Sequence, residues 1–188
     1  MPTHVALLRG INVGGRNSVP MADLRRIVAS LGHTDVATYI QSGNVVFTSA
    51  ASDTGDLAAS MERAIADALG VRPRVVVLSR CELAQVVADN PYPDEHNPKL
   101  VHVVFGSAQP TAKTHDAVAN AQRVSAAKGS RDAVTVVGRV MYLHTPDGFG
   151  RSELAAQLSR IGGAWADGAV GTARNWATVT KLLTICER

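Results

Sequence analysis

The 188-residue chain has only two cysteines and few aromatic residues, and both shortages exclude classes of protein. Cys81 and Cys186 cannot form the disulfide framework of a small secreted domain, and no Cys-x-x-Cys motif is present. Aromatic residues make up 4% of the chain, which leaves few surfaces on which single-stranded nucleic acid could stack. We therefore expect a cytoplasmic protein, with nucleic acid as a partner that the sequence supports only weakly.

Long apolar runs are also missing. No apolar run approaches the roughly 20 residues that a membrane-spanning helix requires. The first residues, Met1-Pro2-Thr3-His4, lack the charged segment and the apolar segment of a secretory signal. We expect no membrane partner and no secretion.

The charge of the chain is mildly basic and is not concentrated in any run. The formal net charge is +3; residues 1–90 carry eight basic and eight acidic groups, and residues 91–188 carry eleven and eight. Strong nucleic-acid binders usually cluster lysine and arginine on one face or in one run. The hydrophobic content of 46% is sufficient for a packed core and argues against a disordered chain.

The first half of the chain alternates predicted strands and helices in a known order. Apolar runs predict strands at residues 4–9, 36–40, 45–48 and 74–78. Helical spacing predicts a helix from Pro20 to Gly32 and a second helix that Gly70 ends. This strand–helix–strand–strand–helix–strand order is that of a ferredoxin-like fold. A capping box at Ser79 and Glu82 starts a further helix.

After the proline-rich residues 90–99, the same order returns. Strands are predicted at 100–105, 133–137 and 140–144, helices at 110–126 and around Leu158, and a short extended piece at 169–172. The expected fold is therefore α/β (α+β), with two ferredoxin-like α/β plaits whose antiparallel sheets have helices packed on one face. The expected division is a first plait with a trailing helix at 1–89, a linker at 90–99, and a second plait with a C-terminal helix at 100–188.

A glycine-rich loop at residues 9–17, Arg-Gly-Ile-Asn-Val-Gly-Gly-Arg-Asn, follows the first strand. Its glycines allow positive φ, and we expect it to offer free backbone N–H groups to an anion at a helix N-terminus. The loop nearly matches a P-loop, but Arg16 replaces the lysine and Asn17 replaces the magnesium-holding hydroxyl residue. Nucleotide hydrolysis is disfavoured, which leaves a non-nucleotide anion site or a purely structural loop.

The predicted topology brings a second polar segment to this loop. The second strand should run parallel to the first with the third between them, so residues 9–17 and the turn at 41–44 should share one edge of the sheet. The turn reads Gln-Ser-Gly-Asn, which by itself suits a hairpin.

The last predicted helix opens at Thr172, which can serve as its N-cap. Arg174, Thr178 and Lys181 then follow at helical spacing and should share one face. This face is either an ordinary solvated surface or the lining of an anion-binding cleft.

The sequence gives little support for a metal site or for a catalytic serine. Asp94, Glu95, His96 and His102 match no zinc spacing. No Gly-x-Ser-x-Gly elbow is present, and Ser42 has no assignable histidine partner. We expect no cofactor and no metal, and no catalytic residue can be assigned.

Four stretches carry a resemblance to a known family. Residues 7–15, 19–21, 39–47 and 172–176 resemble the domain of unknown function 1697 family of mostly bacterial proteins. The resemblance spans nearly the whole chain. It implies a two-part cytosolic α/β protein with ferredoxin-like plaits, and it implies no activity.

Three hypotheses remain open. The first is a module that binds a phosphate- or carboxylate-bearing small molecule or a nucleic-acid backbone; the second is a protein-interaction or assembly element; the third is an enzyme acting on small phosphorylated substrates. The candidate ligand-binding residues are Arg9, Asn12, Gly14, Gly15, Arg16, Gln41, Ser42, Asn44, Arg174 and Lys181. The sequence leaves the oligomeric state open.

Overall fold

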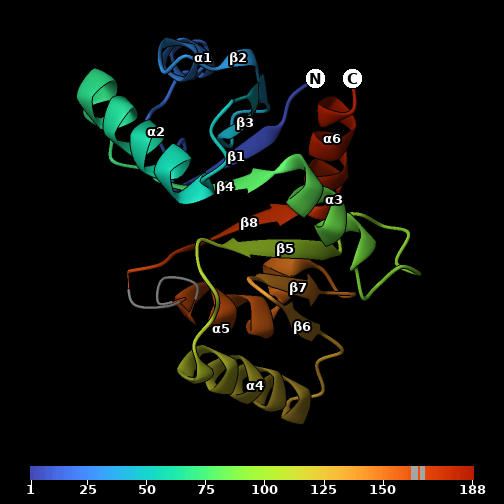
Figure 1. Ribbon diagram of the computed structural model, residues 1–188. Helices are drawn as coiled ribbons and strands as arrows, with labels where there is room; N and C mark the ends of the chain where they lie inside the picture. The colour runs from blue at the N-terminus through green and yellow to red at the C-terminus, as the bar shows by residue number, and fades with distance from the viewer. Residues whose placement is uncertain (162–164, 166–167) are drawn as a thin grey trace. The chain divides into compact units, whose positions relative to one another are not determined.

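Each half of the chain folds around a four-stranded antiparallel sheet, as the computed structural model shows (Figure 1). The structure describes residues 1–161, 165 and 168–188. The helices pack against the two sheets in an α+β fold, so the predicted fold class is confirmed. The chain divides into two compact units, Met1–Gln85 with Thr180–Arg188, and Val86–Val179.

The first sheet has the strand order β2-β3-β1-β4. Its strands are β1 (His4–Arg9), β2 (Thr34–Tyr39), β3 (Asn44–Thr48) and β4 (Arg74–Ser79). Because β3 is antiparallel to both β1 and β2, these two run parallel to each other, as the sequence predicts. The β1 strand thus lies between β3 and β4 in the middle of the sheet.

Helices α1 (Met21–Ser30) and α2 (Thr54–Leu69) cover one face of this sheet (Figure 1). Alternate strand residues such as Leu8 and Phe47 pack there against Leu24 and Met61 of the helices. Each of these side chains is at most 2% exposed, and burying one of them contributes roughly 1.5–3 kcal/mol. The helix α1 begins late, directly after Pro20, and α2 ends at Gly70 in the left-handed conformation, as predicted.

The second sheet repeats this topology with the order β6-β7-β5-β8. Its strands are β5 (Val101–Gly106), β6 (Ala133–Val137), β7 (Val140–His144) and β8 (Gly171–Asn175). Helices α4 (Ala112–Ala127) and α5 (Glu153–Ile161) pack against one face, and the short 3-10 helix η1 (Phe149–Arg151) precedes α5.

Two further helices, α3 (Arg80–Ala88) and α6 (Trp176–Cys186), follow the last strand of each sheet. The capping box of α3 is confirmed, since the Ser79 N–H donates to Glu82 Oε2 at 2.8 Å and the Glu82 N–H donates to Ser79 Oγ at 3.1 Å. The compact units divide within both helices, at 85/86 and at 179/180. The sequence-based division at 90–99 therefore stays a prediction.

The predicted start of the last helix is wrong. Thr172 is not its N-cap, because Thr172 pairs with Phe105 inside the β5–β8 ladder. The helix begins four residues later, and the Thr178 N–H donates to Asn175 Oδ1 at 2.9 Å in a typical N-cap bond. Pairing with a strand some seventy positions earlier overrides the local capping signal.

Trp165 fills a space in the second unit that only glycine leaves open. It is fully buried, and its Nε1–H donates to the carbonyl oxygen of Ala108 at 2.7 Å. A Cβ atom at Gly106 would lie 2.2 Å from Trp165 Nε1. Real Cβ atoms do not approach other atoms so closely, so a side chain at Gly106 would displace the indole ring.

Gly106→Ala should therefore destabilise the protein by about 1–3 kcal/mol through overpacking. The melting temperature should fall by roughly 2–4 °C for each kcal/mol lost. Thermal and urea unfolding measure the change. Gly150→Ala is the matched control, because an added Cβ there meets no atom within 4 Å. Equal stability of the two variants would contradict the role assigned to the indole ring.

Candidate functional site

The glycine-rich loop and the β2–β3 turn meet at one edge of the first sheet; together, residues 9–17 and 40–44 are called the rim here. Asn12 Nδ2 donates to the Gln41 carbonyl oxygen at 2.9 Å. The Leu8 N–H donates to the Gly43 carbonyl oxygen at 2.8 Å. A Cβ atom at Gly43 would lie 2.7 Å from Ile11 Cδ1, so the two segments touch. The predicted convergence of the segments is confirmed.

The tip of the loop is a tight turn, Val13 to Arg16. The Arg16 N–H donates to the Val13 carbonyl oxygen at 3.1 Å, and the two residues between them, Gly14 and Gly15, have φ of 58° and 73°. Two consecutive left-handed residues are typical of a type I′ turn. The tip is separated from α1 by several residues, and α1 starts only after Pro20. The predicted position of these N–H groups at a helix N-terminus is therefore wrong, whereas an anion site at the loop stays a prediction.

The side chain of Asn12 stabilises the loop through hydrogen bonds to backbone groups. Its Oδ1 accepts a hydrogen bond from the Val19 N–H at 2.8 Å, and its Nδ2 donates to the carbonyl oxygens of Val19 at 3.0 Å and Gln41 at 2.9 Å. Both amide hydrogens and the amide oxygen are thus engaged within the protein. Asn17 adds a similar bond from its Nδ2 to the Gly10 carbonyl oxygen at 2.9 Å. Asn12 therefore positions the rim, and its amide is not available to donate to a ligand.

Asn44 has a comparable structural role in the turn. It is fully buried, and its Nδ2 donates to the Tyr39 carbonyl oxygen at 3.0 Å and to Ser42 Oγ at 3.1 Å. Gln41 and Ser42 are exposed at the surface of the turn. Of the three predicted polar contacts of the turn, only Gln41 and Ser42 are accessible to a ligand.

The rim presents donors and apolar side chains to the solvent. Gly14, Gly15 and Arg16 are exposed, and within the part of the chain that the structure describes, the two glycine N–H groups and the Arg16 guanidinium make no hydrogen bond. Val13 is 68% exposed and Ile40 is 51% exposed. The rim therefore combines hydrogen-bond donors, the positive charges of Arg9 and Arg16, and two apolar side chains.

Positive charge also gathers where β1 enters the loop. Arg9, the last residue of β1, lies directly opposite Arg74 of β4 in the strand register. Like charges in directly opposed positions repel each other. The Arg74 guanidinium is balanced in part by Glu62, whose Oε1 lies 3.2 Å from Arg74 Nε.

The predicted basic face of the last helix does not form. Arg174 lies in β8 and Lys181 lies in α6, so the helical spacing that connected them does not apply. Arg174 is 8% exposed, and its Nη1 donates to Thr172 Oγ1 at 2.9 Å and to the Ala173 carbonyl oxygen at 2.8 Å. Burial lowers the pKa of the Arg174 guanidinium to about 10. This arginine is therefore a buried side chain of β8 and is not exposed to a ligand in solution.

A histidine–carboxylate pair in the second unit has no counterpart in the sequence analysis. Glu95 Oε2 lies 2.9 Å from His144 Nε2, and the ring of Tyr92 lies against the imidazole, with centroids 5.0 Å apart. These residues border a cavity of about 270 Å³. The backbone N–H of Asn97 and the neighbouring His144 lower the pKa of Glu95. Glu95 and His144 lie 49 positions apart, so no local sequence motif predicts that they form a pair.

No metal site emerges from the described residues. They contain no group of three or more histidine, cysteine, aspartate or glutamate side chains arranged to hold a metal ion. None of the helices in this part of the chain is long and apolar enough to cross a membrane.

Asn12→Ala should loosen the rim, because it removes three hydrogen bonds and leaves the Val19 N–H without its acceptor. We expect a loss of about 1–3 kcal/mol in unfolding free energy and faster hydrogen exchange at the Val19 amide. Gln41→Ala is the control, since the bond to Asn12 uses only the Gln41 backbone carbonyl. Unchanged exchange at Val19 in Asn12→Ala would refute the structural role of this side chain.

Comparisons with known proteins agree with this fold and add no activity. No curated protein matches the chain. Among solved structures, a conserved bacterial protein from Streptococcus pneumoniae is similar, with 21% sequence identity, a TM-score of 0.72, and coverage of 98% of both chains. At this identity the likeness shows the shared fold alone. The family described as "Protein of unknown function (DUF1697)" matches residues 1–142, and the chain therefore belongs to the DUF1697 family.

Proposed function

We propose that the rim of the first unit binds a small molecule that carries a phosphate or carboxylate group. The observation that carries this proposal is the exposed Gly14–Gly15 turn, whose two N–H groups have no hydrogen-bond partner among the described residues and which is followed directly in the chain by the exposed Arg16. Backbone N–H groups and guanidinium groups form charge-assisted hydrogen bonds to anionic oxygens.

The residues of the rim take different roles in this proposal. Gly14 and Gly15 donate backbone N–H groups, and Arg16 supplies charge. The exposed side chains of Gln41 and Ser42 reach the ligand from the second segment. Arg9, at the base of the loop, adds to the positive potential. Asn12 and Asn44 hold the two segments in place and do not contact the ligand.

The supporting geometry is preorganised. Asn12 and Asn17 fix the loop through hydrogen bonds to Val19, Gln41 and Gly10. A loop that is already ordered loses less conformational entropy when a ligand binds. The rim is also open to water, so each contact is screened, and we expect weak affinity with a strong dependence on salt.

A second function, a protein-interaction surface, is favoured by one observation. Val13 and Ile40 expose large apolar side chains on the two segments that meet at the rim. Ile40 does so with φ of 51°, a left-handed conformation that a β-branched residue adopts only at an energetic cost. A partner protein would cover these side chains, whereas a small anion would leave them in contact with water.

The test is calorimetric titration of the protein with inorganic phosphate, a mononucleotide, a dicarboxylate and a short oligonucleotide. We expect at least one of the first three to bind, and Arg16→Ala to weaken that binding by about 3- to 10-fold, since one exposed charge-assisted contact is lost. Raising the salt concentration should weaken binding further.

Arg63→Ala is the matched control, because Arg63 is an exposed arginine on α2 of the same unit. An equal effect of both substitutions would reduce the result to general charge attraction and refute the rim as the site. Binding of none of the anions, together with a stable complex that Ile40→Ser disrupts, would favour the protein-interaction surface instead.

A further inference from the structure

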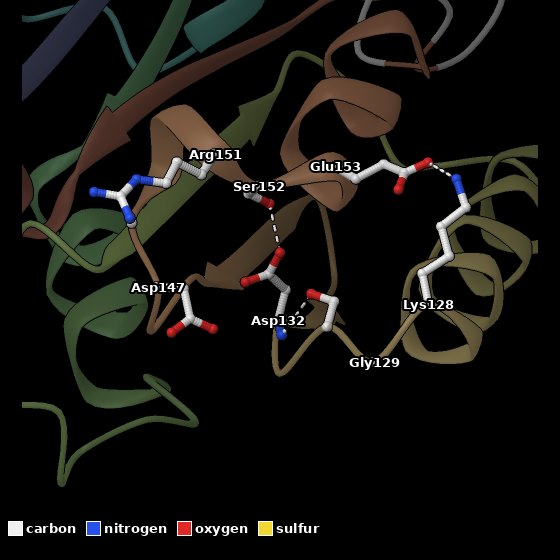
Figure 2. Close-up of a pocket in the computed structure, with 9 residues that line it drawn as sticks. Lys128, Gly129, Asp132, Asp147, Arg151, Ser152 and Glu153 are labelled. Atoms are coloured by element: carbon white, nitrogen blue, oxygen red, sulfur yellow. Dashed lines mark hydrogen bonds and ion pairs between the residues drawn. The ribbon is translucent and has the colours of Figure 1, made fainter.

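The second unit contains a cavity of about 260 Å³ that is independent of the rim. It lies where the end of α4, the helix η1 and the first turn of α5 come together (Figure 2). The charged side chains that border it are Lys128, Asp132, Asp147, Arg151 and Glu153. Two of them, Asp132 and Arg151, form no ion pair with any residue that the structure describes.

The negative side is a nearly buried carboxylate. Asp132 is 6% exposed, and its Oδ2 accepts the hydroxyl proton of Ser152 at 2.7 Å. Ser152 Oγ in turn accepts the Ala155 N–H at 2.8 Å, which makes Ser152 the N-cap of α5. Figure 2 shows the other carboxylate oxygen of Asp132 directed toward the part of the cavity where Arg151 and Asp147 lie.

This carboxylate lacks a cation. Among the described residues, no lysine, arginine or histidine forms an ion pair with Asp132. The N-terminus of α5 provides a partial positive charge, but a buried carboxylate is usually paired with a full one. The Oδ1 atom is therefore open to a hydrogen-bond donor that carries positive charge.

The positive side is the guanidinium of Arg151. It forms no ion pair or hydrogen bond with any residue that the structure describes. Its neighbour Asp147 is already bound by Arg131, whose Nη2 lies 2.5 Å from Asp147 Oδ1. Both arginines contribute to lowering the pKa of Asp147. Asp147 is thus paired with Arg131, and Arg151 has no carboxylate paired with it among the described residues.

The remaining charges of the cavity cancel. Lys128 Nζ is bonded to Glu153 Oε1, as Figure 2 shows. With this pair formed, Asp132 and Arg151 are the two charged lining residues without an ion pair among the described residues; Asp132 is nearly buried, and Arg151 is exposed. A ligand that satisfies both must carry an ammonium group for the carboxylate and a carboxylate group for the guanidinium.

We propose that this cavity binds a small zwitterion of the α-amino acid class. The ammonium group donates to Asp132 Oδ1, and the carboxylate group accepts hydrogen bonds from the Arg151 guanidinium. Ligand pockets typically enclose about 300–1,000 Å³, so a cavity of about 260 Å³ suits a molecule no larger than a single free amino acid. Arginine is suited to a carboxylate because its planar fork can bond both oxygens.

The test compares three small probes that differ in which charged groups they carry. L-Alanine carries both groups, ethylamine carries only the ammonium group, and propionate carries only the carboxylate group. Titration followed by amide chemical shifts should detect L-alanine at millimolar concentrations, with shifts confined to residues around Asp132 and Arg151. Ethylamine and propionate should each bind at least about 10-fold more weakly.

Asp132→Asn and Arg151→Gln should each weaken L-alanine binding by about 10-fold or more. The asparagine can still accept the Ser152 hydroxyl, so the cap of α5 is retained. Arg160→Gln is the control, since Arg160 is an exposed arginine on α5 outside the cavity lining. Arg16→Ala, at the rim, should leave L-alanine binding unchanged, so the two sites can fail independently.

Three outcomes would overturn the proposal. One is the absence of L-alanine binding at about 50 mM, a concentration that detects even very weak complexes. Another is propionate or ethylamine binding as well as L-alanine, which would make the cavity a site for a single charge. The third is full retention of L-alanine binding in Asp132→Asn. If Asp132→Asn unfolds, the comparison of the three probes on the unaltered protein still decides the question.

Discussion

The antiparallel pairing of β3 with both β1 and β2 is the constraint on which the candidate rim depends. With β3 between them, β1 and β2 run in the same direction and end at the same edge of the sheet. The loop after β1 and the turn after β2 must then lie together. Asn12 completes the arrangement with hydrogen bonds to Val19 and Gln41, and Gly43 permits the close contact with Leu8 and Ile11.

The rim and the cavity of the second unit differ in how they would recognise charge. At the rim, Arg16 and the glycine N–H groups are exposed, so water and salt weaken every contact they make. In the cavity, Asp132 is nearly buried, and a contact in a less polar surrounding is stronger and more selective. If the two proposals hold, an anion at the rim would be held loosely, whereas the cavity would select a ligand by the sign of both of its charges.

Much of the fold could be predicted because its signals are local. The hairpin at 133–144 and the helix stops at Gly32 and Gly70 follow from residue spacing and turn chemistry. The start of the last helix could not be predicted in this way. Thr172 has the side chain of a typical N-cap residue, but it pairs with Phe105 in a strand. The predicted Arg174–Lys181 face failed for the same reason. In both cases the local preference for a helix was overridden by hydrogen bonding to β5, which is distant in the sequence.

The amino-acid sequence by itself determined the order of strands and helices, the family, and the meeting of the glycine-rich loop with the Gln41 turn. Only the tertiary structure decided which polar groups remain available. In the folded chain, the amide of Asn12 is hydrogen-bonded to backbone carbonyl groups, and Asn44 is buried within the turn. It also brought Asp132 to Ser152, twenty positions away. The physical reason is that a hydrogen-bond donor or acceptor is consumed by whichever partner folding brings near, and those partners come from distant parts of the chain.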